Sequence, residues 1–282
     1  MTDQPTKSTS DKFHTTLAFA SLRGGGQTAK LLLNRPDHAN AFSAQMMDEI
    51  TAHVDTLKAA TDVRVLVVTG AGKHFSAGAD LAWMQASAKL SLAENLKDAE
   101  RLRSMFEALA TLEVPKIAAI RGAVYGGAVG LVACCDFAVA HPSAKFCLSE
   151  ARLGLLPAVI APYLLRKIKI GQLRRLALSG LVFTASDAKE FGLLEVISGP
   201  QEGPASDDLE LAVNAEINAL LACGPLAQKA IIQLLEGLRS KGNPQGDDTI
   251  QAISKARTGA EGQAGLGSFF SKTPPPWIRS LN

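Results

Sequence analysis

The chain of 282 residues contains no apolar run near the roughly 20 residues that a transmembrane helix requires. Its formal net charge is only +2, so charge gives no reason to expect a nucleic acid or an anionic membrane as a partner. It has four cysteines, and two of these are adjacent, which is not the spacing of a metal site. We therefore expect buried, reduced thiols and a reducing compartment.

The opening segment "MTDQPTKSTSDK" is polar, includes two aspartates and has no arginine. It has neither the apolar core of a secretory signal nor the arginines of a transit peptide. We therefore expect residues 1–12 to form a disordered tail and the protein to be cytoplasmic.

The apolar segments that are present alternate between two patterns. β-Branched runs at 63–70 and 116–122 predict strands that are covered on both faces, and shorter strands are expected at 30–34, 136–140 and 145–149. Apolar residues at helical spacing predict a helix from Ser43 and a longer one from Leu92, which Pro115 ends. This alternation is typical of an α/β fold with crossover connections.

After about residue 158 the pattern becomes helical, most clearly at 207–239 and 247–258. The stretch 199–208, "GPQEGPASDD", is rich in glycine, proline and acidic residues and is the best candidate linker. We therefore divide the chain into an α/β core at 13–200 and a helical region at 201–282.

Each of the two buried strands leads into a loop of small residues, "FSAGAD" and "RGAVYGGAVG", that opens a helix. Backbone N–H groups at a helix N-terminus are unsatisfied and favour anionic oxygen. Two such groups could converge on one carbonyl oxygen and form an oxyanion hole. For either loop taken alone, tight turns and close helix packing are the simpler explanation of these glycines. Neither loop has a phosphate-binding pattern.

Five separated motifs carry a resemblance. The segments are "LNRPDHANAF", "VLVVTGAGKHFSAGADLAWM", "KIAAIRGAVYGGAVGLVACCDFAVA", "KFCLSEARLGLLP" and "TASDAKEFGLLEVI", with a weaker echo in "FFSKTPPPW". In order and spacing they resemble the enoyl-CoA hydratase/isomerase (crotonase) superfamily over about residues 15–200. The resemblance implies a spiral of ββα turns followed by helices that form a homotrimer or homohexamer. It also implies an acyl-CoA thioester as substrate, with no separate cofactor and no metal.

The resemblance assigns the catalytic groups motif by motif. The oxyanion-hole donors are the backbone N–H groups of Ala79 and Gly127, and the carboxylate is Glu150. A typical hydratase carries a second glutamate three residues beyond the glycine donor, where this chain has Gly130. We expect Gly130 to leave room for water or for a bulky substituent at C3 of the substrate.

The resemblance also suggests residues that bind substrate. Asp80, beside the first donor, is more simply a helix cap than a catalytic acid. Arg152 could meet a distal carboxylate through two hydrogen bonds, although a solvated arginine is the simpler interpretation. Lys272 resembles the family's C-terminal basic residue near the CoA 3′-phosphate, often contributed across a subunit boundary.

Further candidates line the expected path of the substrate. Trp83 could line the acyl pocket or pack in the core, and Tyr125 and Val129 flank the donor glycine. The backbone along the adenine and pantetheine path would come from three alanines: Ala39, Ala41 and Ala77.

Three functions remain open at this point: hydration with one glutamate, double-bond isomerisation with one glutamate, and binding of CoA esters without catalysis. RNA binding is a weaker alternative, because the chain has no obvious basic stripe. The motifs look most like bacterial hydratases of 3-methylglutaconyl-CoA, in leucine catabolism, or of isohexenylglutaconyl-CoA, in acyclic terpene catabolism. Both substrates are branched at C3 and carry a distal carboxylate, so hydration is favoured.

Overall fold

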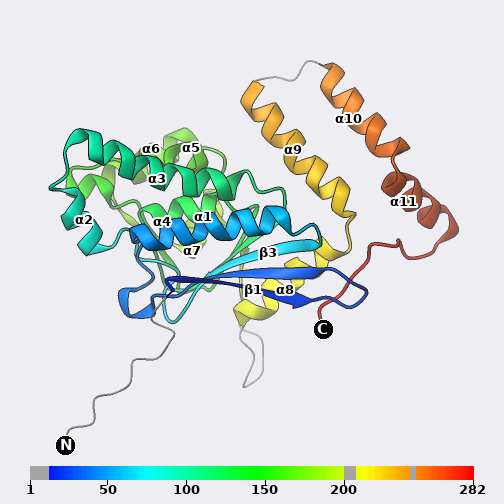
Figure 1. Ribbon diagram of the computed structural model, residues 1–282, viewed down its shortest axis with the longest axis horizontal. Helices are drawn as coiled ribbons and strands as arrows, with labels where there is room; N and C mark the ends of the chain where they lie inside the picture. The colour runs from blue at the N-terminus through cyan, green and yellow to red at the C-terminus, as the bar shows by residue number, and fades with distance from the viewer. Residues whose placement is uncertain (1–12, 200–207, 242–245) are drawn as a thin grey trace, which may run out of the picture.

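The computed structural model describes residues 13–199, 208–241 and 246–282 (Figure 1). The expected N-terminal tail and most of the expected linker lie outside these residues. The main sheet has six strands in the order β1-β2-β3-β4-β6-β9. Their bounds are β1 Thr15–Ser21, β2 Gln27–Leu33, β3 Val63–Gly70, β4 Lys116–Ile120, β6 Phe137–Ala140 and β9 Val196–Ile197. Only β1 and β2 pair antiparallel; the other neighbours in the sheet are parallel.

A second sheet of three strands, in the order β5-β7-β8, sits beside the first. Its strands are β5 Ala123–Tyr125, β7 Lys145–Cys147 and β8 Val182–Thr184; β5 and β7 are parallel, and β8 is antiparallel to β7. The strands β1, β5, β8 and β9 were not predicted from the sequence. Three of them have only two or three residues, too few to show a period.

The prediction that the strand at 63–70 is covered on both faces is confirmed. Val65 and Val67 pack with the apolar face of α8, Asp208–Leu221, while Leu66 and Val68 belong to the core beneath α1, Ala44–Ala59, and α3, Leu92–Ala110. In the view of Figure 1, α1 and α3 lie above the sheet and α8 lies below it.

Both predicted helix starts are confirmed. The Ser43 hydroxyl accepts a hydrogen bond from the Met46 N–H, and Ser91 and Glu94 form a capping box at the start of α3. The prediction that the apolar face of α3 is buried is wrong for its first turns, since Leu92 and Leu96 are 78% and 63% exposed. The first turns of α3 extend beyond the core, so only its second half is buried.

The remaining helices follow the sheets or lie between their strands. They are α2 Leu81–Ser87, α4 Gly127–Ala133, α5 Ala161–Leu164, α6 Ile170–Ser179, α7 Ala185–Glu190, α9 Pro225–Lys241, α10 Gly246–Thr258 and α11 Ala260–Ser271. Figure 1 shows α9, α10 and α11 projecting from the core as a separate helical arm, after which the C-terminus returns to the edge of the sheet.

The helical segment expected at 207–239 is broken, because α8 and α9 meet at 99°. Arg64 of β3 fixes this bend from the core side by donating hydrogen bonds to the carbonyl oxygens of Cys223 and Trp277. In the described part of the chain, no single helix has the length and apolarity to cross a membrane; this bent pair meets the criterion only when joined.

The expectation of buried thiols holds for three of the four cysteines, Cys134, Cys135 and Cys147. It is wrong for Cys223, which is exposed because it lies in the bend between α8 and α9.

Candidate active site

The two glycine loops run side by side. Ser76 and Val124 form a parallel bridge, with hydrogen bonds of 3.0 Å from the Ser76 N–H to the Ala123 carbonyl and 3.1 Å from the Tyr125 N–H to the Ser76 carbonyl. Counting three residues forward in each loop brings Ala79 beside Gly127. Ala79 and Gly127, the two predicted oxyanion donors, are 48 positions apart in the sequence, and the pairing of their loops places them next to each other.

Gly78 allows this close approach. Its φ is +93°, and a Cβ there would lie 2.6 Å from the Tyr125 carbonyl oxygen, so any other residue would both clash and be strained. The loop before Ala79 therefore rests directly on the backbone that leads to Gly127.

Both donor N–H groups are available to a ligand. Phe42 pairs with the residues on either side of Ala79, since its N–H donates to the Gly78 carbonyl and its carbonyl accepts from the Asp80 N–H. This pairing directs the Ala79 N–H to the opposite side, and Gly127 is the first residue of α4. Within the described residues, neither N–H group has a backbone or side-chain acceptor. This is the arrangement that an oxyanion hole requires.

Glu150 brings its carboxyl group to the same place. It opens a 3-10 helix, Glu150–Leu153, shortly after β7, and β7 pairs with the β5 strand that leads to Gly126. A Cβ on Gly126 would lie 3.4 Å from the Glu150 Oε1. The Oε2 atom is buried and has no hydrogen-bond partner in the described part of the chain. Burial raises the pKa of Glu150, and the hydrogen bond from its own backbone N–H only partly opposes this.

Asp80 caps α2 directly after the first predicted donor and pairs with Arg35. Its carboxylate caps α2 by accepting hydrogen bonds from the Ala82 and Trp83 N–H groups, which confirms the predicted cap. Its Oδ2 lies 3.0 Å from Nη1 of Arg35, and both side chains are nearly buried. Burial alone would raise the pKa of Asp80, but the α2 N–H bonds and Arg35 outweigh it, so that pKa is lowered.

Arg35 was missed in the sequence. The same guanidinium donates a 2.8 Å hydrogen bond to the Ala41 carbonyl, so Arg35 ties the segment 39–41 to the donor loop. The only signal in the sequence is its place after β2, before a proline turn, and this does not reveal its partners.

The three alanines predicted along the adenine and pantetheine path are joined through the backbone or lie in the same turn. The Ala77 N–H donates a 2.9 Å hydrogen bond to the Ala39 carbonyl, and Ala41 is buried. Asn40, another residue that the sequence did not reveal, holds this turn at φ +54° by donating from its side-chain amide to the carbonyls of Ala71 and His74.

The expectation that Gly130 leaves an open space is wrong. A Cβ at position 130 would lie 2.3 Å from Cγ2 and 2.7 Å from Cβ of Ile160, and 3.3 Å from Cε1 of Phe106. Ile160, which precedes α5, is 3% exposed and already fills the position that a side chain at 130 would take. A carboxylate is absent here, and an aliphatic side chain replaces it.

The other predicted binding residues are less directly placed. Tyr125 and Trp83 are half-buried, and Trp83 packs on the main core, whereas Val129 is a fully buried residue of α4. Arg152 is exposed and lies against Gly180, where a Cβ would meet its Nε at 2.9 Å. Lys272 ends α11, and Figure 1 places that helix at the opposite end of the molecule from α2. Within one chain, Lys272 is therefore not brought to Glu150.

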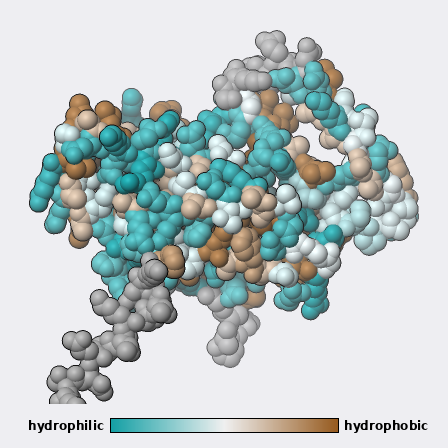
Figure 2. Space-filling view, in the orientation of Figure 1, coloured by the Kyte–Doolittle hydropathy of each residue, from teal (hydrophilic) through white to brown (hydrophobic). Residues whose placement is uncertain are grey.

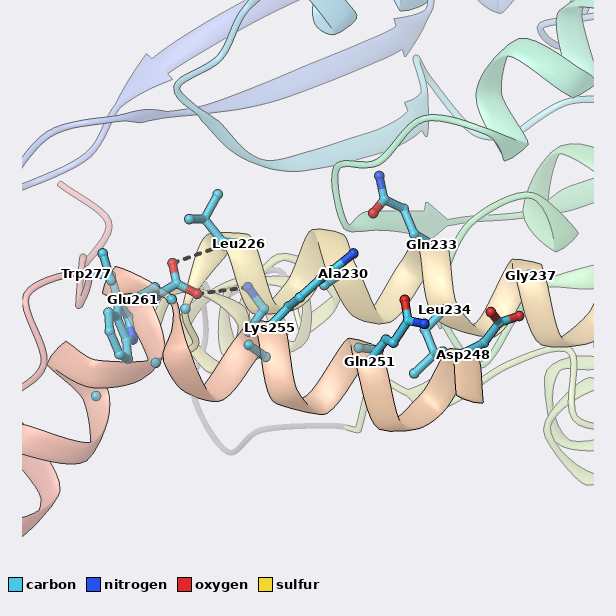
Figure 3. A pocket seen from close by; sticks show the side chains of 18 of the residues that line it. Leu226, Ala230, Gln233, Leu234, Gly237, Asp248, Gln251, Lys255, Glu261 and Trp277 are labelled. Atoms are coloured by element: carbon cyan, nitrogen blue, oxygen red, sulfur yellow. Dashed lines mark hydrogen bonds between the residues drawn. The ribbon is translucent and has the colours of Figure 1, made fainter. Parts of the chain in front are cut away.

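A large groove lies away from this site. It has a volume of about 670 Å³ and runs between α9 and the pair α10–α11 (Figure 3). Glu261 closes one end by accepting hydrogen bonds from the Leu226 and Ala227 N–H groups at the start of α9. None of the predicted catalytic residues lines it, so we place the chemistry at the glycine loops.

The glycine loops and Glu150 define a site that can hold the oxygen of a carbonyl compound and move a proton close to it. The family model described as enoyl-CoA hydratase/isomerase matches residues 24–279. An enoyl-CoA hydratase structure from Shewanella pealeana is 35% identical with a TM-score of 0.86, covering 96% of this chain and 100% of that one.

Two further relatives agree. The structure of Pseudomonas aeruginosa AtuE is 32% identical with a TM-score of 0.84, covering 93% of this chain and 99% of that one. Enoyl-CoA hydratase EchA19 of Mycobacterium tuberculosis is 35% identical over 212 residues, which are 74% of this chain and 76% of that protein.

The chain belongs to the enoyl-CoA hydratase/isomerase family. It is an enzyme of the crotonase superfamily, whose members act on acyl-CoA thioesters, and the predicted α/β crotonase fold is confirmed.

Proposed function

We propose that this enzyme adds water across the C2=C3 bond of an enoyl-CoA thioester with Glu150 as its only acid–base group. The observation that carries the proposal is the Glu150 carboxyl next to Gly126: its Oε2 is buried with no hydrogen-bond partner among the described residues, and Ile160 replaces a second acid. Its raised pKa suits a group that must accept a proton and return it.

The reaction follows from these positions. The thioester oxygen accepts hydrogen bonds from the Ala79 and Gly127 N–H groups. Glu150 removes a proton from water, the resulting oxygen bonds to C3, and the C2=C3 electron pair moves toward the thioester oxygen. The two N–H groups hold the enolate; one such donor typically contributes about 3–4 kcal/mol. Glu150 then returns its proton to C2, giving a 3-hydroxyacyl-CoA.

For the acyl group we propose a glutaconyl-type chain branched at C3, either 3-methylglutaconyl-CoA of leucine catabolism or isohexenylglutaconyl-CoA of acyclic terpene catabolism. An aliphatic wall at Ile160 suits an alkyl branch better than a carboxylate would. The absence of a second acid at position 130 also removes a repulsion against the distal carboxylate of such a substrate.

A second candidate is double-bond isomerisation within the same fold. One carboxylate can remove a proton from C2 and deliver it to C4, and the apolar contact between Gly130 and Ile160 favours this alternative because it excludes a second polar group that could bind water. Isomerisation leaves the mass of the ester unchanged, whereas hydration adds one water.

We also propose that the enzyme works without a cofactor in the cytoplasm as a homotrimer or homohexamer. The helical arm supports assembly: Figure 2 shows hydrophobic surface along it, and Phe269 and Phe270 at the end of α11 are 77% and 76% exposed. A partner's arm would also offer a route for Lys272 to reach a CoA phosphate in a neighbouring site. Sedimentation equilibrium tests the assembly by giving its mass.

The test of the reaction is a mass-resolved turnover assay with 3-methylglutaconyl-CoA, comparing the wild type with Glu150→Gln. We expect the wild type to add one water and the variant to lose about 10²–10⁴-fold in kcat. Glu190→Gln is the matched control, because Glu190 is an exposed carboxylate at the end of α7.

Three results contradict the proposal in different ways. A shifted double bond at constant mass indicates the isomerase. Binding of several acyl-CoA esters without turnover indicates a binding protein. Full hydration by Glu150→Gln means that another group carries the proton.

A further inference from the structure

Position 130 and Gly127 lie on one face of α4. They are three residues apart, which in a helix places them on the same side and about 4.5 Å apart along the axis. A Cβ at either position would approach the same ring, with Phe106 Cζ at 3.8 Å from position 127 and Phe106 Cε1 at 3.3 Å from position 130. The surface that continues from the Gly127 donor toward position 130 is therefore formed by Phe42, which would lie 3.3 Å from a Cβ at position 127, and then by Phe106 and Ile160.

This surface lies where the C3 end of a bound acyl group would fall. When the thioester oxygen is held by the Gly127 N–H, the carbonyl carbon is one bond away and C3 is two bonds further. The three bonds from oxygen to C3 span under about 4 Å, and the hydrogen bond adds about 3 Å, so C3 falls within roughly one turn of α4 from the Gly127 nitrogen. The substituent on C3 would then reach the part of the wall that Ile160 makes.

The space at this wall is small. The separation of 2.3 Å between a Cβ at 130 and the Ile160 Cγ2 shows that not even a methyl group fits between α4 and Ile160. Ile160 is a β-branched side chain with restricted χ1, and it stands one residue before α5, whose Tyr163 ring lies 5.7 Å from the Phe106 ring. Ile160 is thus held between α4 on one side and the start of α5 on the other.

We propose that Ile160 is a specificity-determining residue that closes the acyl pocket at C3, so that the enzyme selects a short C3 branch over a long one. This inference rests on the proposed hydratase site and selects, between the two candidate esters, the one with the methyl branch. Gly130 contributes by letting Ile160 approach α4; it does not itself provide room for substrate.

The test compares kcat/KM for 3-methylglutaconyl-CoA and isohexenylglutaconyl-CoA in the wild type, Ile160→Val and Ile160→Ala. We expect the wild type to prefer the methyl ester, and Ile160→Ala to move the ratio at least about 10-fold toward the long branch, since one hydrocarbon group in an apolar pocket is worth about 10–200-fold. Ile160→Val, which keeps the β-branch, should move it less.

Ile168→Ala is the matched control. Ile168 is also buried in the main core, at 2% exposed, so its truncation should cost comparable stability, but the three atoms nearest a Cβ at position 130 belong to Ile160 and Phe106. We expect this variant to lower both rates in proportion and leave the ratio unchanged. If Ile160→Ala behaves in the same way, Ile160 is only a core residue and the inference is wrong.

A binding measurement separates this inference from the proposed reaction. Calorimetric titration of both esters into Glu150→Gln and into Glu150→Gln/Ile160→Ala needs no turnover. If the wild type hydrates neither ester, the proposed function fails, yet a 10-fold change in the ratio of the two affinities still supports the wall at Ile160. An unchanged ratio overturns the inference whatever the reaction is.

Discussion

The Arg35–Asp80 pair makes a prediction in which stability and activity can be separated. Both side chains are nearly buried, at 12% and 10% exposed, and their charged atoms lie 3.0 Å apart. Asp80→Asn keeps an oxygen that can cap α2, because asparagine is as good an N-cap as aspartate. It removes the charge, however, and leaves the Arg35 guanidinium without a counterion.

Breaking a fully buried pair costs about 3–5 kcal/mol. Since both groups keep some contact with solvent, we expect Asp80→Asn to lower the free energy of unfolding by about 2–3 kcal/mol, below that full-burial range. Asp80→Ala should cost about 1 kcal/mol more, because it also removes the cap. Urea unfolding at neutral pH measures both. Asp55→Asn, in the exposed pair with Lys58, should change stability by less than about 0.5 kcal/mol.

The same substitution should reduce turnover, because Asp80 follows the Ala79 donor directly. Loss of a whole oxyanion donor lowers kcat by about 10²–10³-fold, and we expect a displaced donor to cost about 10–100-fold in kcat with a smaller effect on KM. The folded-state pKa of Asp80 is lowered, so its contribution to stability is full above its unfolded pKa and is lost as pH falls through the folded value. A variant as stable and as active as the wild type at neutral pH would refute this account of the loop.

Two further predictions follow from Glu150 and Gly78. Burial raises the pKa of Glu150, so the wild type should lose stability as pH rises from the unfolded to the folded pKa of this group. Urea unfolding should show Glu150→Gln as stable as the wild type near pH 4 and more stable than the wild type at pH 8. Gly78→Ala should lower Tm and abolish most turnover, because its Cβ would lie 2.6 Å from the Tyr125 carbonyl oxygen. The control is Gly171→Ala in α6, where a Cβ has no neighbour within 4 Å; thermal unfolding should show it to be neutral or slightly stabilising.

The sequence was sufficient wherever a local pattern determines the structure. The β-branched run at 63–70 has apolar residues on both faces, and it is the strand that two cores share. Ser43 begins its helix as predicted, because a hydroxyl before a helical pattern satisfies a free N–H group. The predicted oxyanion donors were assigned by motif, and the parallel bridge between Ser76 and Val124 explains why the two loops that carry them lie side by side.

The sequence was insufficient where the partner comes from a distant segment. The sequence indicates only that Arg35 lies in a turn, and the structure adds its hydrogen bonds to Ala41 and Asp80. The exposed start of α3 could not be foreseen either, because a helical period does not show where a helix leaves the core.

Gly130 illustrates this limit most clearly, since its identity invites the conclusion that a glycine leaves a space. Whether a missing side chain leaves a cavity depends on what packs against the backbone, and folded interiors rarely tolerate an empty volume of that size. Here the segment before α5, thirty residues further along the chain, brings Ile160 into the position. The departure from the two-glutamate pattern is therefore a replacement of an acid by an aliphatic wall, which is why the size of the C3 branch, and not the volume at Gly130, is the property that the Ile160 variants should change.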